Sequence, residues 1–199
     1  MILLRPTALI LLATMSIGLL AGCAGKDPGH ATPETQTGSA TGTSTNPSTS
    51  FPGVELDLSK FASKPCDALT ATQATSLGAF KTPETGNGIL GPSCVWRAQK
   101  VLEGATYEIT MVTKGSTLQS MTEVNKTLDV FKETKVEGYS AISWDQTNGK
   151  GNCSTAVGTS NKDAILVQMN AANTESPEHK DSCGASEKVA ALVIQNLKG

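Results

Sequence analysis

CSTAVGTS (153–160), NKD (161–163) and AILVQMNA (164–171) follow one another in this chain and predict a β-hairpin. The two outer runs have the length of strands, and the three polar residues between them are typical of a turn. Two strands joined in this way lie side by side and antiparallel. An antiparallel sheet is therefore the basis of the predicted fold.

Further strands extend this hairpin into a meander. Residues 106–113 alternate in polarity, so that Tyr107, Ile109 and Met111 face one way and polar residues the other. Residues 93–99 and 135–144 also predict strands, and Asn148-Gly149 is a turn signal before the hairpin. We expect these strands to form one antiparallel sheet.

Three helices are predicted around the sheet. The capping box Thr70-Ala71-Thr72-Gln73 opens a short helix that ends at Leu77 and Gly78. A second box, Ser116-Thr117-Leu118-Gln119, opens an apolar stripe at helical spacing made of Leu118, Met121, Val124, Leu128 and Phe131. Residues 182–197 predict a final helix whose apolar side carries Val189, Leu192, Val193 and Leu197. Helices packed on an antiparallel sheet make an α+β domain.

Four cysteines in the predicted domain indicate two disulfides, which form in an oxidising compartment. They are Cys66, Cys94, Cys153 and Cys183, and three connectivities are open to them. The hairpin returns beside Cys153, which favours Cys153 with Cys183, and a similar return after the first helix favours Cys66 with Cys94. The wide spacing is unlike that of a four-cysteine zinc site, so we expect no metal.

Leu20-Ala21-Gly22-Cys23 ends an apolar run that starts at Ala8, shortly after Arg5. This arrangement is typical of a secretory signal peptide, and the cysteine indicates a bacterial lipoprotein cleaved between Gly22 and Cys23. Cys23 would carry diacylglycerol and a further acyl lipid, and we expect no other cofactor. A membrane-spanning anchor is the alternative, but about 13 apolar residues are fewer than the roughly 20 a spanning helix needs.

Residues 23–53 form a tether rich in Thr, Ser, Pro, Gly and Ala. Such a segment cannot bury enough apolar surface to offset its loss of conformational entropy, so we expect disorder. Its Thr/Ser/Pro content is also compatible with O-linked sugars. The predicted organisation is a signal peptide (1–22), a tether (23–53) and one folded extracytoplasmic domain (54–199). The lipid would hold this domain at the outer face of the cell membrane.

Charge and composition exclude some partners. The 16 Lys and Arg against 18 Asp and Glu give a net charge of −2, and loss of Arg5 with the signal gives 15 − 18 = −3. There is neither a basic stripe nor an aromatic-rich face of the kind that binds nucleic acid. We expect the membrane and an unknown envelope protein or small ligand as partners.

Catalytic motifs are weak, and we assign no catalytic residue. Gly86-Asn87-Gly88-Ile89-Leu90-Gly91 matches the glycine pattern of dinucleotide sites, but its surroundings favour a flexible loop. His179 is the one histidine of the predicted domain, and no nucleophile elbow accompanies it. We interpret it as a solvated residue near the start of the last helix.

Two further groups of side chains leave alternatives open. Carboxylates from distant parts of the chain would form a site only if the fold brought them together, and they are Asp145, Asp163, Glu175, Glu178 and Asp181. Large aromatic residues on predicted strands are interpreted as core, with an apolar cleft for a lipid, glycan or peptide as the alternative. They are Trp96, Tyr107, Tyr139 and Trp144.

The whole chain resembles one family. The residues that carry the resemblance are the lipobox, Pro65-Cys66-Asp67-Ala68-Leu69-Thr70, Gly91-Pro92-Ser93-Cys94-Val95-Trp96, Val136-Glu137-Gly138-Tyr139, the Cys153 strand and Cys183. The chain is similar to the actinobacterial secreted lipoproteins classed as domain of unknown function 3558. The resemblance implies a cell-envelope location and no established activity. The order of elements also resembles mycobacterial kinase sensor domains and the Mog1/PsbP-type α/β/α sandwich, an analogy that does not fix function.

These observations favour a non-enzymatic, membrane-tethered binding or interaction module. A carrier or sensor of a small hydrophobic or envelope-derived ligand is the alternative, and an envelope hydrolase ranks below both. A deep apolar cavity under the sheet would favour the carrier, whereas a filled core with an exposed flat patch would favour the interaction module.

Overall fold

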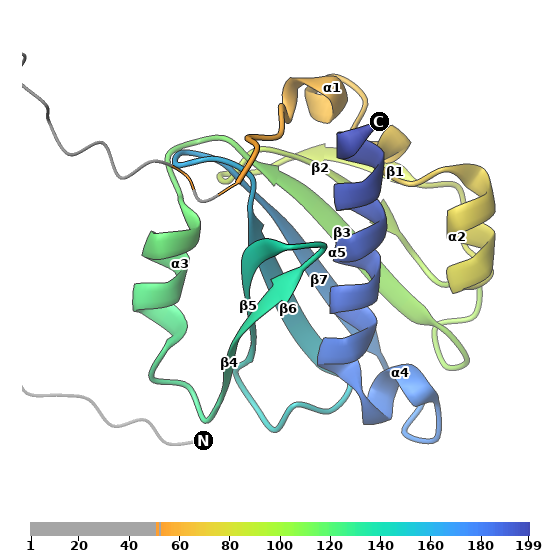
Figure 1. Ribbon diagram of the computed structural model, residues 1–199. Helices are drawn as coiled ribbons and strands as arrows, with labels where there is room; N and C mark the ends of the chain where they lie inside the picture. Colours follow the sequence, from red (N-terminus) through yellow and green to blue (C-terminus); the bar gives the residue numbers. More distant parts are fainter. Residues whose placement is uncertain (1–50, 52) are drawn as a thin grey trace, which may run out of the picture. The chain divides into compact units, whose positions relative to one another are not determined.

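The computed structural model describes residue 51 and residues 53–199 of the chain (Figure 1). Gly22, Cys23 and the predicted signal peptide lie outside the described residues, as does the tether apart from Phe51 and Gly53. No helix within the described part of the chain is long and apolar enough to cross a membrane.

A single seven-stranded sheet forms the centre of the domain, and all of its strand pairs are antiparallel. Its order across the sheet is β1-β2-β3-β7-β6-β5-β4. The strands are β1 (Glu84–Asn87), β2 (Pro92–Trp96), β3 (Ala105–Val112), β4 (Val130–Val136), β5 (Tyr139–Asp145), β6 (Asn152–Gly158) and β7 (Ala164–Ala171). The hairpin predicted over 153–171 is β6 and β7, which occupy inner positions of the sheet.

Helices pack against both faces of this sheet (Figure 1). They are α1 (Ser59–Ala62), the 3₁₀ helix η1 (Pro65–Ala68), α2 (Ala71–Leu77), α3 (Leu118–Asn125), α4 (Pro177–Lys180) and α5 (Ser182–Lys198). Met111 contributes to the core beneath α5, whereas its neighbour Val112 contributes to the core beside α3. Because successive strand residues point to opposite faces, α5 and α3 cover different faces. The predicted α+β fold class is confirmed.

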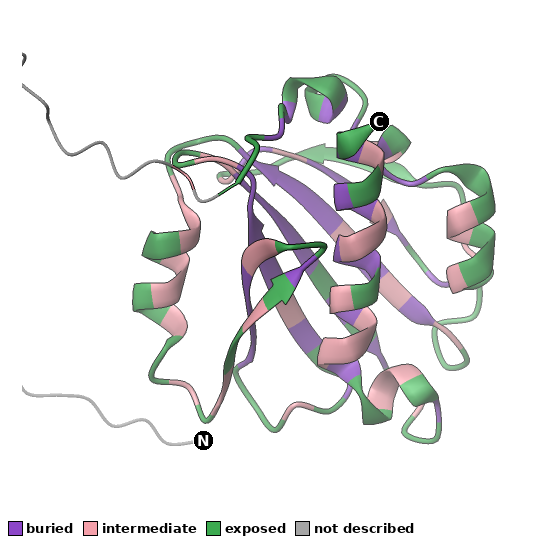
Figure 2. Ribbon diagram, viewed as in Figure 1, coloured by how far each residue is buried: buried purple, intermediate pink, exposed green. Residues whose placement is uncertain are grey.

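The larger core lies between the sheet and α5. Trp96, Tyr107 and Ile109 from the sheet pack with Val193 and Ile194 of α5, and each of these five is at most 2 % exposed. Figure 2 shows that buried residues are concentrated in the strands and on the inner side of α5. The space between the sheet and α5 is therefore filled by side chains. A carrier with a deep apolar cavity under the sheet would need this space to be open.

Both predicted disulfides are confirmed. Cys66 bonds Cys94 and Cys153 bonds Cys183, which is the pairing that the hairpin geometry favours. The first joins η1 to β2, and the second joins β6 to the first turn of α5. Both therefore fix helical segments to the sheet.

The helix predicted from Leu118 to Phe131 is wrong in its second half. Helix α3 ends at Asn125, Val124 is 76 % exposed, and Phe131 belongs to β4. Its capping box pairs Thr117 with Ser120, one residue later than predicted. Residues 130–136 form a strand because they pair with β5. Tertiary hydrogen bonding therefore overrides the local helical pattern.

The single strand predicted over 135–144 is also wrong, since it comprises the end of β4 and most of β5. Glu137 and Gly138 form a two-residue turn between them, with φ of 52° and 89°. Two successive residues with positive φ are typical of the tight turn that joins hairpin strands. The missed signal is Glu-Gly, because a glutamate seldom takes this conformation.

The glycine-rich segment 86–91 is not the flexible loop that we predicted. Gly86 and Asn87 belong to β1 and pair with Ser93 and Pro92 of β2. Gly91 has a φ of 147°, and a Cβ there would lie 1.9 Å from the Met111 carbonyl oxygen. Strand β2 follows where a dinucleotide site requires a helix. These glycines therefore serve a tight turn packed against β3.

Candidate functional site

His179 is held by the backbone, contrary to the solvated side chain that we predicted. Its Nδ1 lies 2.8 Å from the Ala171 carbonyl oxygen, so Nδ1 carries the proton and donates. The ring also lies against Gly151, where a Cβ would come within 2.8 Å of it. Within the described residues the ring bonds no serine hydroxyl. The hydrogen bond from His179 therefore connects α4 to the end of β7.

Four of the five candidate carboxylates serve separate local structures. The Asp163 carboxylate accepts from the Ser160 hydroxyl, Glu175 pairs with Lys180, and Asp181 caps α5 by accepting from the Gly184 N–H at 3.0 Å. Asp145 is buried and accepts from the Thr147 hydroxyl at 2.6 Å and from the Gly149 N–H at 2.8 Å. Burial opposes its ionisation, but these hydrogen bonds outweigh burial and hold the pKa of Asp145 below its ordinary value.

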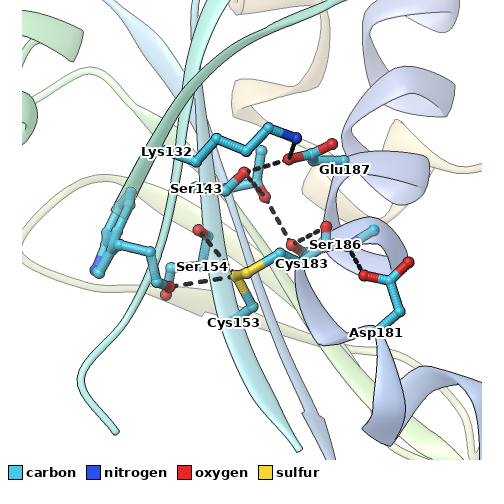
Figure 3. A network of polar contacts seen from close by, with 11 residues as sticks. Lys132, Ser143, Cys153, Ser154, Asp181, Cys183, Ser186 and Glu187 are labelled. Carbon is cyan, nitrogen blue, oxygen red and sulfur yellow. Dashed lines mark hydrogen bonds and ion pairs between the residues drawn. A yellow bond between two sulfur atoms is a disulfide. The ribbon is translucent and has the colours of Figure 1, made fainter. Parts of the chain in front are cut away.

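A chain of hydroxyl groups joins the sheet to α5 beside the Cys153–Cys183 disulfide (Figure 3). Ser143 donates to Glu187 at 2.8 Å and lies 2.9 Å from the Thr155 hydroxyl, which lies 2.6 Å from the Ser186 hydroxyl. Lys132 pairs with the same Glu187 oxygen at 3.6 Å. Each hydroxyl has one proton to donate. All three hydroxyls are bonded when Ser186 donates to Thr155, Thr155 donates to Ser143, and Ser143 donates to the Glu187 carboxylate.

This hydroxyl chain is a structural feature rather than an accessible site. Ser143, Thr155 and Ser186 are each at most 1 % exposed. Hydrogen bonding satisfies polar groups that would otherwise be costly to bury. The sequence has no signal for this chain of hydroxyl groups, because serine and threonine are abundant here and their inward positions follow only from the register of β5 and β6 and the docking of α5.

Helix α2 is bordered by clefts on several sides, and none of its residues is buried (Figure 2). It is attached to α5 through Gln73 and Asn196, whose side-chain amides exchange hydrogen bonds at 3.1 and 2.7 Å. Ala74 and Leu77 pack in part against the core. Helix α2 therefore lies between recesses whose linings include core residues.

The largest of these recesses, which we call the apolar cleft, has a volume of about 800 Å³. Its lining includes Cys66, Leu69, Ala71, Ala74, Phe80 and Trp96. A second recess of about 300 Å³, which we call the Glu178 cleft, is lined by Leu77, Tyr107, Pro177, Glu178, Asp181 and Ala185 among others. A third recess at the C-terminal end of α2 shares Leu77 and Glu178 with the second.

The two main clefts lie on opposite sides of α2. At 100° per residue, Ala71, Ala74, Thr75 and Gly78 cluster on one side of the helix, whereas Ser76 and Leu77 flank the other. The first group lines the apolar cleft and the second lines the Glu178 cleft. Helix α2 therefore separates the apolar cleft from the Glu178 cleft.

Three of the large aromatic residues are core, as we interpreted them, whereas Tyr139 is only half-buried and, like Trp96 and Tyr107, lines a recess. Trp144 is 8 % exposed and packs on the α3 side, while the half-buried Tyr139 donates to the Val54 carbonyl at 2.8 Å. Trp96 lines the apolar cleft and Tyr107 lines the Glu178 cleft, although each is only 2 % exposed. Burial, together with the charge of Glu178, raises the pKa of Tyr107 to about 12.

No group of three or more His, Cys, Asp and Glu side chains able to hold a metal ion occurs in the part of the chain that the structure describes. A family model described as "Protein of unknown function (DUF3558)" matches residues 18–196 of the chain. This confirms the resemblance to domain of unknown function 3558. Neither a curated protein nor a solved structure matches the chain.

Proposed function

The chain belongs to the family of proteins of unknown function DUF3558, and we propose that it is a lipid-anchored binding module of the cell envelope. In this proposal Cys23 carries the lipid and the folded domain binds a partner at the clefts around α2.

Anchoring is supported by the sequence around Cys23. Leu20-Ala21-Gly22-Cys23 follows a short apolar run and Arg5, and the family match includes it because the match begins at residue 18. Diacylglycerol has two acyl chains, and stable membrane attachment takes about two such chains. The two disulfides suit the oxidising outer side of a membrane. We therefore propose the extracytoplasmic face of the cell membrane as the location.

Recognition is supported chiefly by the apolar cleft. Its volume of about 800 Å³ lies within the roughly 300–1,000 Å³ of ligand sites. Trp96 and Phe80 offer aromatic surface, and α2 forms a wall whose residues are all at least partly exposed. A cleft of this kind suits an apolar side chain of an envelope protein. Binding is favoured over hydrolysis because His179, Asp145 and Asp181 hold local structure.

A carrier or sensor of a small hydrophobic ligand is the second candidate. The observation that favours it is the weak packing of α2, whose side chains are all at least partly exposed. Displacement of such a helix would enlarge the apolar cleft toward Trp96 and Phe80. A ligand retained through purification would distinguish this function from protein recognition.

The test compares two alanine-to-tryptophan substitutions in the full-length protein. Ala71 is exposed and lines the apolar cleft, so Ala71→Trp fills it. Ala62 is an exposed residue of α1 outside that lining, so Ala62→Trp is the matched control. Each protein is crosslinked in cells, purified from membranes and analysed by mass spectrometry.

We expect wild type and Ala62→Trp to retain the same neighbour or ligand and Ala71→Trp to lose it. Equal recovery by all three proteins would place recognition elsewhere on the domain. Recovery of neither neighbour nor ligand from the wild type would contradict the binding function itself.

A further inference from the structure

The Glu178 cleft contains a carboxylate without a partner. Glu178 is half-buried, and within the described residues it forms neither an ion pair nor a hydrogen bond. The other acidic residue of the lining, Asp181, is exposed and already accepts from the Gly184 N–H. An unpaired carboxylate beside low-dielectric protein gains considerably from a cation.

The hydroxyl of Tyr107 is a second, independent feature of the same cleft. Tyr107 is 2 % exposed, its ring meets Phe80 edge-on at 6.1 Å between centroids, and its side chain lines the cleft near Glu178. No hydrogen bond to this hydroxyl is found in the described part of the chain. The ring is buried but the hydroxyl oxygen opens onto the cleft, so a ligand atom that enters the cleft can bond it.

We propose that the Glu178 cleft binds the ammonium group of an aliphatic primary amine. Its nitrogen has three protons, so it can donate to Glu178 and to the Tyr107 oxygen at once. The methylene groups would lie along Leu77, Pro177 and Ala185, which form the apolar part of the lining. A volume of about 300 Å³ suits a short aliphatic chain rather than a large ring system.

Lys188 is the one cationic residue in the lining of this cleft. It is exposed, and its ammonium pairs with neither Glu178 nor Asp181 in the described residues. The proposal goes beyond the proposed function, since it assigns a chemical group to a cleft on the other side of α2. An amine could come from a free small molecule or from a lysine-type side chain of a peptide, and the two sources share the same ammonium chemistry.

The experiment titrates the full-length protein, in micelles of a neutral detergent, with n-pentylamine and with n-pentanol. The amine is protonated at pH 7, as lysine is, while the alcohol has the same chain without the charge. A capped Gly-Lys-Gly peptide tests the peptide source. Binding is followed by the backbone amide signals of Leu77, Gly184 and Ala185 in NMR spectra.

We expect saturable binding of the amine and little binding of the alcohol. Glu178→Gln should weaken amine binding about tenfold or more, since hydrogen bonds to charged groups contribute strongly, and Tyr107→Phe should weaken it about threefold to tenfold. Glu175→Gln is the matched control, because Glu175 is exposed and outside the cleft. Lys188→Met should leave binding intact or strengthen it. Thermal melting establishes that each variant is folded.

Equal binding of amine and alcohol, absence of saturable amine binding, or an unchanged affinity in Glu178→Gln would overturn the proposal. Binding of pentylamine but not of the peptide would assign the site to a free amine. The result is independent of Ala71→Trp, which acts on the apolar cleft, so failure of this inference leaves the proposed function open to its own test.

Discussion

Thr155→Val and Thr159→Val are the same substitution at two positions that are each 0 % exposed, yet we expect opposite effects on stability. Valine has nearly the shape of threonine and replaces the hydroxyl with a methyl group. Any difference between the two variants therefore reports on hydrogen bonding rather than on packing volume.

At Thr155 the hydroxyl lies 2.9 Å from that of Ser143 and 2.6 Å from that of Ser186. Each lost hydrogen bond costs about 0.5–1.5 kcal/mol. Ser143 keeps Glu187 as an acceptor, and the Ser186 hydroxyl can donate to the Cys183 carbonyl instead of Thr155, so neither donor is orphaned. We therefore expect Thr155→Val to lower the free energy of unfolding by about 1–3 kcal/mol.

At Thr159 the hydroxyl oxygen is, among the described residues, the one buried side-chain polar atom without a hydrogen-bond partner. An unsatisfied buried hydroxyl costs about 1–3 kcal/mol. Its replacement by methyl removes this cost, so Thr159→Val should raise the free energy of unfolding by about 1 kcal/mol. The corresponding shift of the melting temperature is about 2–4 °C per kcal/mol for a chain of this size.

Urea unfolding followed by tryptophan fluorescence measures both effects, because Trp96 and Trp144 are buried in the two cores. Thr110→Val is the control, since Thr110 is 6 % exposed on the sheet and should change stability little. Destabilisation of similar size in Thr155→Val and Thr159→Val would refute the reasoning. It would mean that packing, or an ordered water at Thr159, outweighs the hydrogen-bond pattern.

The remaining predictions concern the anchor, a disulfide and pH. Cys23→Ser should leave an uncleaved precursor or release the protein into the medium, and normal processing with partition into detergent would contradict lipidation. Removal of the Cys153–Cys183 disulfide, which spans 30 residues, should cost about 3–4 kcal/mol in urea unfolding; a loss below about 1 kcal/mol would argue against this estimate. Because the pKa of Asp145 is lower in the folded protein, its stabilising effect is complete above the unfolded value of about 3.9 and is lost as the pH falls through the folded value. Asp145→Asn should thus destabilise at pH 7 more than at pH 3, and an equal effect at both would refute this.

Local signals predicted well the elements that possess them. The Thr70 capping box, the alternation around Tyr107 and the hairpin of β6 and β7 are all present in the structure. Strands β4 and β1 were missed because each is an edge strand with weak local pattern. Residues 130–136 continue the apolar spacing of α3, and residues 84–87 are all exposed. Pairing with β5 and β2 makes these segments strands.

The candidate site was predicted only in part. Trp96 and Tyr107 were identified as aromatic residues that could border a cleft, and Glu178 was one of five candidate carboxylates. The Thr70 capping box predicted α2 itself, but the clefts around it were not foreseen, because they depend on how the helix docks against β2, β3 and α5.

The sequence by itself indicated the features that depend on neighbouring residues: the helix caps, the alternating strands and the even set of four domain cysteines, and it is also the basis for the proposed lipid on Cys23. Tertiary structure decided what depends on residues far apart in the chain. It placed Tyr107 of β3 beside Glu178 of α4, and the hydroxyls of β5 and β6 beside the Glu187 carboxylate and the Ser186 hydroxyl of α5. The physical reason is that sheet register and helix docking bring such groups together through long-range contacts, and no local pattern encodes which unpaired polar groups those contacts leave facing a cleft.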